Sequence, residues 1–121
     1  MSAWVWAAVV LLGGAGAIGR FLLDTLVSGR AGRAFPLGTL AVNASGALLL
    51  GLLSGLAATG DVLLLAGTAT IGSYTTFSTW MLESHRLAEG SAPGGAAANL
   101  VLSLGVGFAA ALAGHAIGAS A

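Results

Sequence analysis

Charge is confined to eight positions in this 121-residue chain, and their placement restricts the fold more than any other feature. They leave four stretches without Asp, Glu, Lys or Arg, at 1–19, 34–60, 62–82 and 90–121. Each stretch can cross a bilayer, since about 20 apolar residues suffice. Only 7% of the residues are charged, whereas soluble domains carry about 25%. The sequence therefore predicts an all-α membrane protein with four transmembrane helices per subunit.

We expect a single four-helix transmembrane domain over residues 1–121. Its spans are predicted at about 4–27, 37–58, 62–87 and 96–117. A cleavable signal peptide is the alternative for the first stretch, but such a peptide has basic residues before its apolar core, and here the first arginine follows it. The absence of cysteine and of Lys/Arg-rich segments leaves disulfide frameworks and nucleic-acid binding without support. No nucleophile, base and orienting acid can be combined, so we expect no enzyme.

Eight hydroxyl side chains crowd into twelve positions of the third predicted span. They are Thr68, Thr70, Ser73, Tyr74, Thr75, Thr76, Ser78 and Thr79. One or two such residues would be explained by hydroxyls that bond to their own helix. Eight of them, with Gly72 among them and Phe77 and Trp80 close by, favour a helix broken near its midpoint. The carbonyls freed by such a break must be satisfied by protein, water or an ion.

Arg20 and Asp24 stand one helical turn apart near the end of the first predicted span. They can form an i, i+4 pair at the membrane interface, where such a pair contributes a few tenths of a kcal/mol. Alternatively, Arg20 lines an aqueous vestibule, since a long arginine can snorkel from that depth. The sequence leaves both interpretations open.

The segment GSYTTFSTW at 72–80 resembles the GxxTTFSTF signature of the Fluc (CrcB) fluoride channels. GGAGAIGR at 13–20 and PLGTLAVNASGALLLG at 36–51 are similar to the glycine-rich first helix and the second helix of that family. The resemblance implies a fluoride-selective channel that passively exports cytoplasmic fluoride across the plasma (inner) membrane. It also implies an antiparallel, dual-topology dimer with two pores and a central structural Na+.

The resemblance also implies roles for individual residues. Carried onto this sequence, the backbone carbonyls of Gly72 and Thr75 would hold the sodium ion. The fluoride pathway would include Asn43, Phe77, Trp80 and Ser103, with the hydroxyls of Thr39, Thr76 and Ser78, and Arg20 and Glu83 would line the vestibule. Two positions depart from the family pattern, because Trp80 stands where a second phenylalanine is usual and Asn99 where a tyrosine is usual.

A small multidrug transporter is the main alternative function, since it is also short, four-spanning and dimeric. That class exchanges protons through a carboxylate within the first helix. Here the first predicted span has no acid before Asp24, close to its end. A purely structural or assembly protein is the other alternative, but it leaves Asn43 and the hydroxyl cluster unexplained.

Arg30, Arg33 and Arg86 all fall on the side of the first and third loops, and no Lys or Arg falls on the other side. The positive-inside rule then predicts that both termini face outward. A dual-topology protein should show little such bias, so a heterodimer with an oppositely oriented homologue is an alternative. We favour the homodimer, because Asn43, both aromatic positions and the central motif occur in this one chain. The partners expected are fluoride, membrane lipid and a second subunit.

Overall fold

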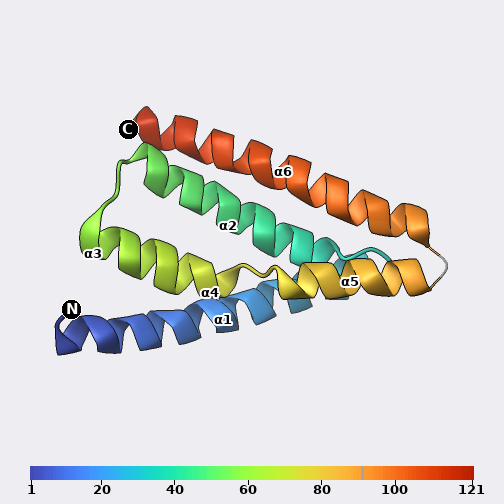
Figure 1. The fold of residues 1–121 in the computed structure, drawn as a ribbon, viewed down its shortest axis with the longest axis horizontal. Helices are drawn as coiled ribbons and strands as arrows, with labels where there is room; N and C mark the ends of the chain where they lie inside the picture. The colour runs from blue at the N-terminus through green and yellow to red at the C-terminus, as the bar shows by residue number, and fades with distance from the viewer. Residues whose placement is uncertain (91) are drawn as a thin grey trace.

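The computed structural model describes residues 1–90 and 92–121. These residues form helices and short connections, and none of them forms a strand. The chain folds into four rods that lie side by side and alternate in direction (Figure 1). The rods are α1 (Ala3–Ala31); α2 (Leu37–Gly55); a composite third rod of α3 (Gly60–Val62), η1 (Leu63–Ile71), α4 (Gly72–Tyr74) and α5 (Ser78–Glu89); and α6 (Pro93–Ala119). The all-α class predicted from the sequence is confirmed. Ser91, between the expected spans 62–87 and 96–117, lies outside the described residues.

Three of the rods, α1, α2 and α6, are each long and apolar enough to cross a membrane as one helix. They overlap the expected spans 4–27, 37–58 and 96–117. The second span was expected to reach residue 58, but α2 ends at Gly55, and Ala57 then takes a left-handed conformation with φ 56°. Such a residue commonly terminates a helix, because it turns the chain away from the helix axis.

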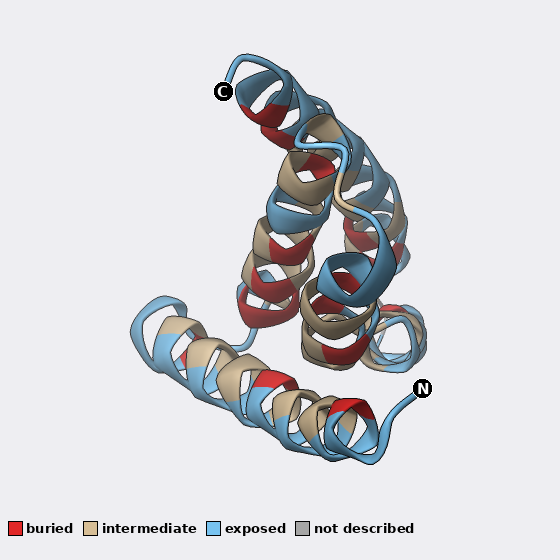
Figure 2. Ribbon diagram, turned by 90° about the vertical axis from the view of Figure 1, so that its left-hand side faces the viewer, coloured by how far each residue is buried: buried red, intermediate tan, exposed pale blue. Residues whose placement is uncertain are grey.

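The α2–α6 contact depends on glycine. Gly51 and Gly55 lie one turn apart on α2, and a Cβ at either position would meet the α6 backbone. Gly114 and Gly118 mirror them on α6, where an added Cβ would meet the α2 backbone. Small residues at four-residue spacing let two helices approach closely, and this packing drives association in lipid. Buried residues form stripes between neighbouring rods, while outward faces are exposed (Figure 2).

The third rod is interrupted between α4 and α5, where Thr75 is extended with φ −81° and ψ 162°. The break separates η1 and α4, which pack on α1, from α5, which packs mainly on α6. The helix break predicted from the hydroxyl-rich segment is therefore present. Residues 63–71 also form a π-helical stretch that the sequence did not predict, and π-helical turns are frequent near functional sites.

We expect Gly16→Ala to destabilise the protein, because a Cβ at Gly16 would meet the Ser73 side chain and the Thr70 carbonyl just before the break. Overpacking of this kind costs about 1–3 kcal/mol. Gly14→Ala, two residues away on the same helix, is the matched control, since nothing lies within 4 Å of its added Cβ. Thermal unfolding in detergent measures both. Equal stability of the two variants would show that α1 does not need this close approach.

Candidate functional site

A pair of hydrogen bonds from Asn43 on α2 holds the break in the third rod. The Asn43 side-chain amide donates to the Thr76 carbonyl at 2.8 Å, and its Oδ1 accepts from the Thr76 N–H at 2.8 Å. In a continuous helix these two backbone groups would bond within the helix itself. Asn43 therefore supplies the partners that the break removes, and the two bonds together fix the orientation of its amide.

Hydroxyl groups satisfy backbone atoms on both sides of the break. Before it, the Ser73 hydroxyl donates to the Ala69 carbonyl at 2.7 Å, and the Thr75 hydroxyl donates to the Ile71 carbonyl at 3.1 Å. After it, Thr76 Oγ1 accepts from the Thr79 N–H at 3.2 Å, as an N-cap side chain does at the start of a helix. The hydroxyl cluster thus contributes to both helix ends.

Among the described residues, four consecutive carbonyls at the break are left without such partners, those of Gly72, Ser73, Tyr74 and Thr75. The Thr75 N–H donates to Ile71 and the Thr76 N–H to Asn43, so neither reaches the Gly72 carbonyl. Within residues 1–90 and 92–121, no hydrogen bond reaches the carbonyl oxygens of Gly72 and Thr75. Backbone oxygens at a helix break are suitable ligands for a hard cation such as Na+. The donor set therefore fits the ion that the resemblance implies.

An open cleft of about 590 Å³ lies over the break, between α2 and the third rod. It brings together six of the predicted site residues: Asn43, Gly72, Thr75, Thr76, Phe77 and Trp80. The remaining lining residues are small, apolar or hydroxyl-bearing, and none of them is charged. Asn43 uses one of its two amide N–H groups on Thr76, so the second remains as a donor at this cleft.

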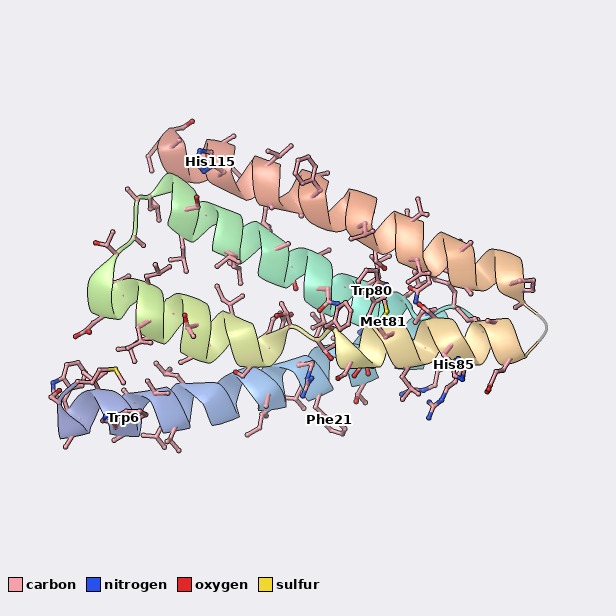
Figure 3. The ribbon with its side chains drawn as sticks, in the orientation of Figure 1. Trp6, Phe21, Trp80, Met81, His85 and His115 are labelled. Carbon is pink, nitrogen blue, oxygen red and sulfur yellow. The ribbon has the colours of Figure 1, made fainter. Side chains whose placement is uncertain are left out.

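Phe77 and Trp80 meet edge to face in the wall of the cleft, with ring centroids 5.7 Å apart and an interplanar angle of 81°. Phe77 is 69% exposed and belongs to neither α4 nor α5. Trp80 lies on the side of α5 turned toward α2 and α6, whereas His85 lies on the opposite side (Figure 3). The Trp80 indole N–H is not available to the cleft, because it donates to the backbone carbonyl of Asn99 at 3.1 Å.

Ser103 and Ser78 lie outside the lining of this cleft. The Ser103 hydroxyl faces Asn99 Oδ1 at 3.4 Å on α6. Ser78 is exposed, and its hydroxyl lies 3.5 Å from that of Thr76. The cleft thus gathers Asn43, Thr76, Phe77 and Trp80 of the expected pathway, while Thr39, Ser78 and Ser103 lie outside its lining.

Two smaller cavities contain the expected vestibule residues. Arg20, Thr39 and Thr76 are among the residues that line one of about 180 Å³. Thr76 also lines the larger cleft, so it lies between the cleft and this cavity. No Arg20–Asp24 ion pair forms in the described part of the chain, and Asp24 instead accepts from Ser28 at 3.1 Å. This arrangement favours the vestibule interpretation of Arg20.

Glu83 lies apart from both spaces. It lines a third cavity, of about 240 Å³, together with Arg33 and Arg86. Its Oε1 is buried and has no hydrogen-bond partner among the described residues. The two expected vestibule residues, Arg20 and Glu83, therefore line different cavities.

Comparison with known proteins decides the family. The family model described as CrcB-like protein, Camphor Resistance (CrcB), matches residues 7–115. The chain belongs to the CrcB family. "Fluoride-specific ion channel FluC 2" of Mycolicibacterium paratuberculosis is 56% identical over 111 residues, which cover 92% of this chain and 91% of that protein. "Fluoride-specific ion channel FluC 1" of Symbiobacterium thermophilum is 42% identical over 119 residues, which cover 93% and 96%.

CrcB proteins are channels and not enzymes, in agreement with the expectation from the sequence. In this CrcB chain, two contacts at the break were not predicted from the sequence. Gly46 on α2 leaves room for the Thr75 methyl group, which an added Cβ would meet. The Tyr74 hydroxyl lies 2.8 Å from the Ser45 hydroxyl and ties α4 to α2. In the sequence, these contacts are indicated only by a small residue, Gly46, and a polar residue, Ser45, close to Asn43 on α2.

We expect Asn43→Leu to destabilise this CrcB chain, because it leaves the N–H and carbonyl of Thr76 without partners in the protein. Two unsatisfied groups cost about 2–4 kcal/mol if they stay dry. Tyr74→Phe is the matched control, since it removes one hydroxyl contact with the same helix, worth about 1 kcal/mol. Thermal unfolding and hydrogen exchange of the Thr76 amide measure the effect. Unchanged exchange in Asn43→Leu would contradict a role for Asn43 in holding the break.

Proposed function

We propose that this chain forms a fluoride-selective channel that passively exports fluoride from the cytoplasm across the plasma membrane. The observation that carries the proposal is the cleft over the helix break, where the free Asn43 N–H lies among hydroxyl and aromatic groups. The 56% identity to a protein named as a fluoride-specific channel supports the same substrate. The combination of a broken helix with an uncharged, donor-bearing cleft is what a small-anion pathway needs.

The chemistry of the cleft suits fluoride. An ion of this size loses a large hydration free energy, so closely spaced donors must replace its water. The second N–H of Asn43 and the hydroxyl of Thr76 are such donors, whereas the Thr75 hydroxyl already donates to the Ile71 carbonyl. Phe77 and Trp80 can add the positive edges of their rings. Neutral donors at several positions allow both entry and release, whereas an arginine side chain at the middle of the pathway would hold the anion too tightly.

The active form in this proposal is an antiparallel, dual-topology dimer with two pores. The cleft is open along one side of the single chain, and a second subunit would close it. A homodimer accounts for the presence of all the cleft residues in one sequence. The bias of Arg30, Arg33 and Arg86 toward one end keeps a heterodimer with an oppositely oriented homologue as the alternative. The names FluC 1 and FluC 2 among the relatives indicate that some organisms carry paralogues.

A structural sodium ion at the dimer centre is part of the same proposal. The carbonyls of Gly72 and Thr75 would hold it, since no hydrogen bond within the described residues satisfies them. A cation fixed there would supply positive potential to the nearby anion path without itself moving. Asn43, by holding Thr76, keeps the chain extended at Thr75, so that no N–H of the following described residues bonds to these carbonyls.

Transport of cationic drugs is the less favoured alternative. A proton-coupled exchanger of that class needs a carboxylate well inside the first helix. In α1 the first acid is Asp24, seven residues before the helix ends at Ala31, and it accepts a hydrogen bond from Ser28. The uncharged cleft offers no counter-ion for a cationic substrate either.

The flux test uses Phe77→Ile in proteoliposomes loaded with fluoride. We expect the parent protein to release fluoride, with a reversal potential set by the fluoride gradient. Phe77→Ile should slow this release about tenfold, because it removes one contact between an aromatic ring edge and the ion. Phe108→Ile is the matched control, because Phe108 is also 69% exposed but lies on α6 outside the cleft. It should conduct as the parent does.

A parent protein that releases no fluoride would refute the channel. Parent-like flux in Phe77→Ile would leave the channel in place and assign Phe77 to packing. A reversal potential that follows a sodium gradient would instead identify a coupled transporter.

Removal of sodium tests the structural ion. We expect protein purified throughout in a bulky organic cation to lose thermal stability and dimer content, because a ligand that binds only the folded form stabilises it by mass action. The stability should return on adding back Na+, with a midpoint that depends on its concentration. Full stability and dimer content in rigorously sodium-free protein would rule out a structural role for Na+ at Gly72 and Thr75.

A further inference from the structure

A closed ring of hydrogen bonds joins α5 to α6 behind the aromatic pair. The Trp80 indole N–H donates to the Asn99 carbonyl at 3.1 Å, and the Asn99 side-chain amide donates to the Ser84 hydroxyl at 2.8 Å. The Ser84 hydroxyl in turn donates to the Trp80 carbonyl at 2.9 Å. Two bonds of this ring cross between the helices, and both involve Asn99.

We propose that Asn99 is a positioning residue that sets the direction of the Trp80 ring and, through it, the ring edge that Phe77 presents to the ion pathway. This inference rests on the proposed channel function. Asn99 is 1% exposed and does not line the cleft, so it acts through Trp80 and does not touch the permeating anion.

Two hydrogen bonds between α5 and α6 restrict the rotation of α5, which a single hydrogen bond would not do. A single bond from Trp80 to α6 would let α5 rotate about its own axis. The second bond, at Ser84 one turn further along α5, removes that rotation. The bonds lie in a buried, low-dielectric position, where hydrogen bonds are stronger than in water. The Trp80 ring is thereby fixed relative to α6.

The Phe77 ring depends on this arrangement. Phe77 lies at the break, outside α4 and α5, and its edge-to-face contact with Trp80 is the one aromatic pair found among the described residues. Edge-to-face pairs have a defined preferred geometry. Because the indole N–H is already bonded to Asn99, Trp80 meets the pathway with its ring edge alone. The direction of the Trp80 ring therefore affects the pathway more than its polar N–H group does.

The test uses a background in which Trp4 and Trp6 are both replaced by Phe, so that Trp80 is the single fluorescent tryptophan. Asn99→Leu is then compared with its parent. We expect lower fluorescence anisotropy of Trp80, and fluoride efflux reduced about fivefold, the effect of losing one net hydrogen bond. The same Asn99→Leu change is then made in a Trp80→Phe background, which has no indole to position. There it should reduce efflux less than about twofold, because the effects of two substitutions on efflux are not additive when the residues act together.

Ser54→Ala is the matched control. It removes a side-chain contact between α2 and α6, Ser54 to His115 at 3.2 Å, away from the aromatic pair. It should change neither Trp80 anisotropy nor efflux. If Asn99→Leu does not fold, Ser84→Ala makes the same test, since it removes the acceptor of the Asn99 amide with a smaller change of shape.

The inference is overturned if Trp80 anisotropy is unchanged. It is also overturned if the Asn99 or Ser84 substitution reduces efflux equally with Trp80 and with Phe at position 80, since Asn99 would then be a general packing residue. Failure of the channel itself would appear differently, as absence of fluoride efflux from the Trp4/Trp6 background protein. Anisotropy reports the position of Trp80 in either case.

Discussion

The paired hydrogen bonds between Asn43 and Thr76 are the interaction on which the rest of this structure depends. A helix broken at membrane depth exposes backbone groups that lipid cannot satisfy, at a cost of several kcal/mol for each. One asparagine on the neighbouring helix satisfies a donor and an acceptor together. With the break held in this way, Thr75 can stay extended, the cleft can open, and Phe77 can lie outside both flanking helices.

Glycine residues outside the Asn43–Thr76 pair give the neighbouring helices the room that this pairing needs. Gly46 leaves space on α2 for Thr75, and Gly16 lets α1 approach the end of α4. The α2–α6 pair, joined through Gly51, Gly55, Gly114 and Gly118, then forms a stable platform beside the break. In lipid, where apolar burial gives little drive to association, such close backbone contact replaces the hydrophobic core of a soluble protein.

The polar residues of the third rod divide into two groups with different tasks. Ser73 and Thr75 bond back to their own helix, and the Thr76 hydroxyl accepts a bond at the start of α5. Ser84 instead joins α5 to the Asn99 side chain of α6. The two departures from the family pattern, Trp80 and Asn99, contact each other directly. This contact uses the backbone carbonyl of Asn99, whereas its side-chain amide reaches α5 separately, at Ser84.

The sequence by itself determined the all-helical class, the break in the third helix and the family. Hydropathy and hydroxyl density are local properties, and the motif at 72–80 is contiguous. Tertiary structure alone decided that Asn43 pairs with both backbone groups of Thr76, that Ser103 lies outside the cleft, and that the Trp80 N–H donates to Asn99 on α6. The side-chain inventory of a sequence shows how many donors a residue has. Which of them remain free depends on residues more than 15 positions away, which are brought near only when the helices pack.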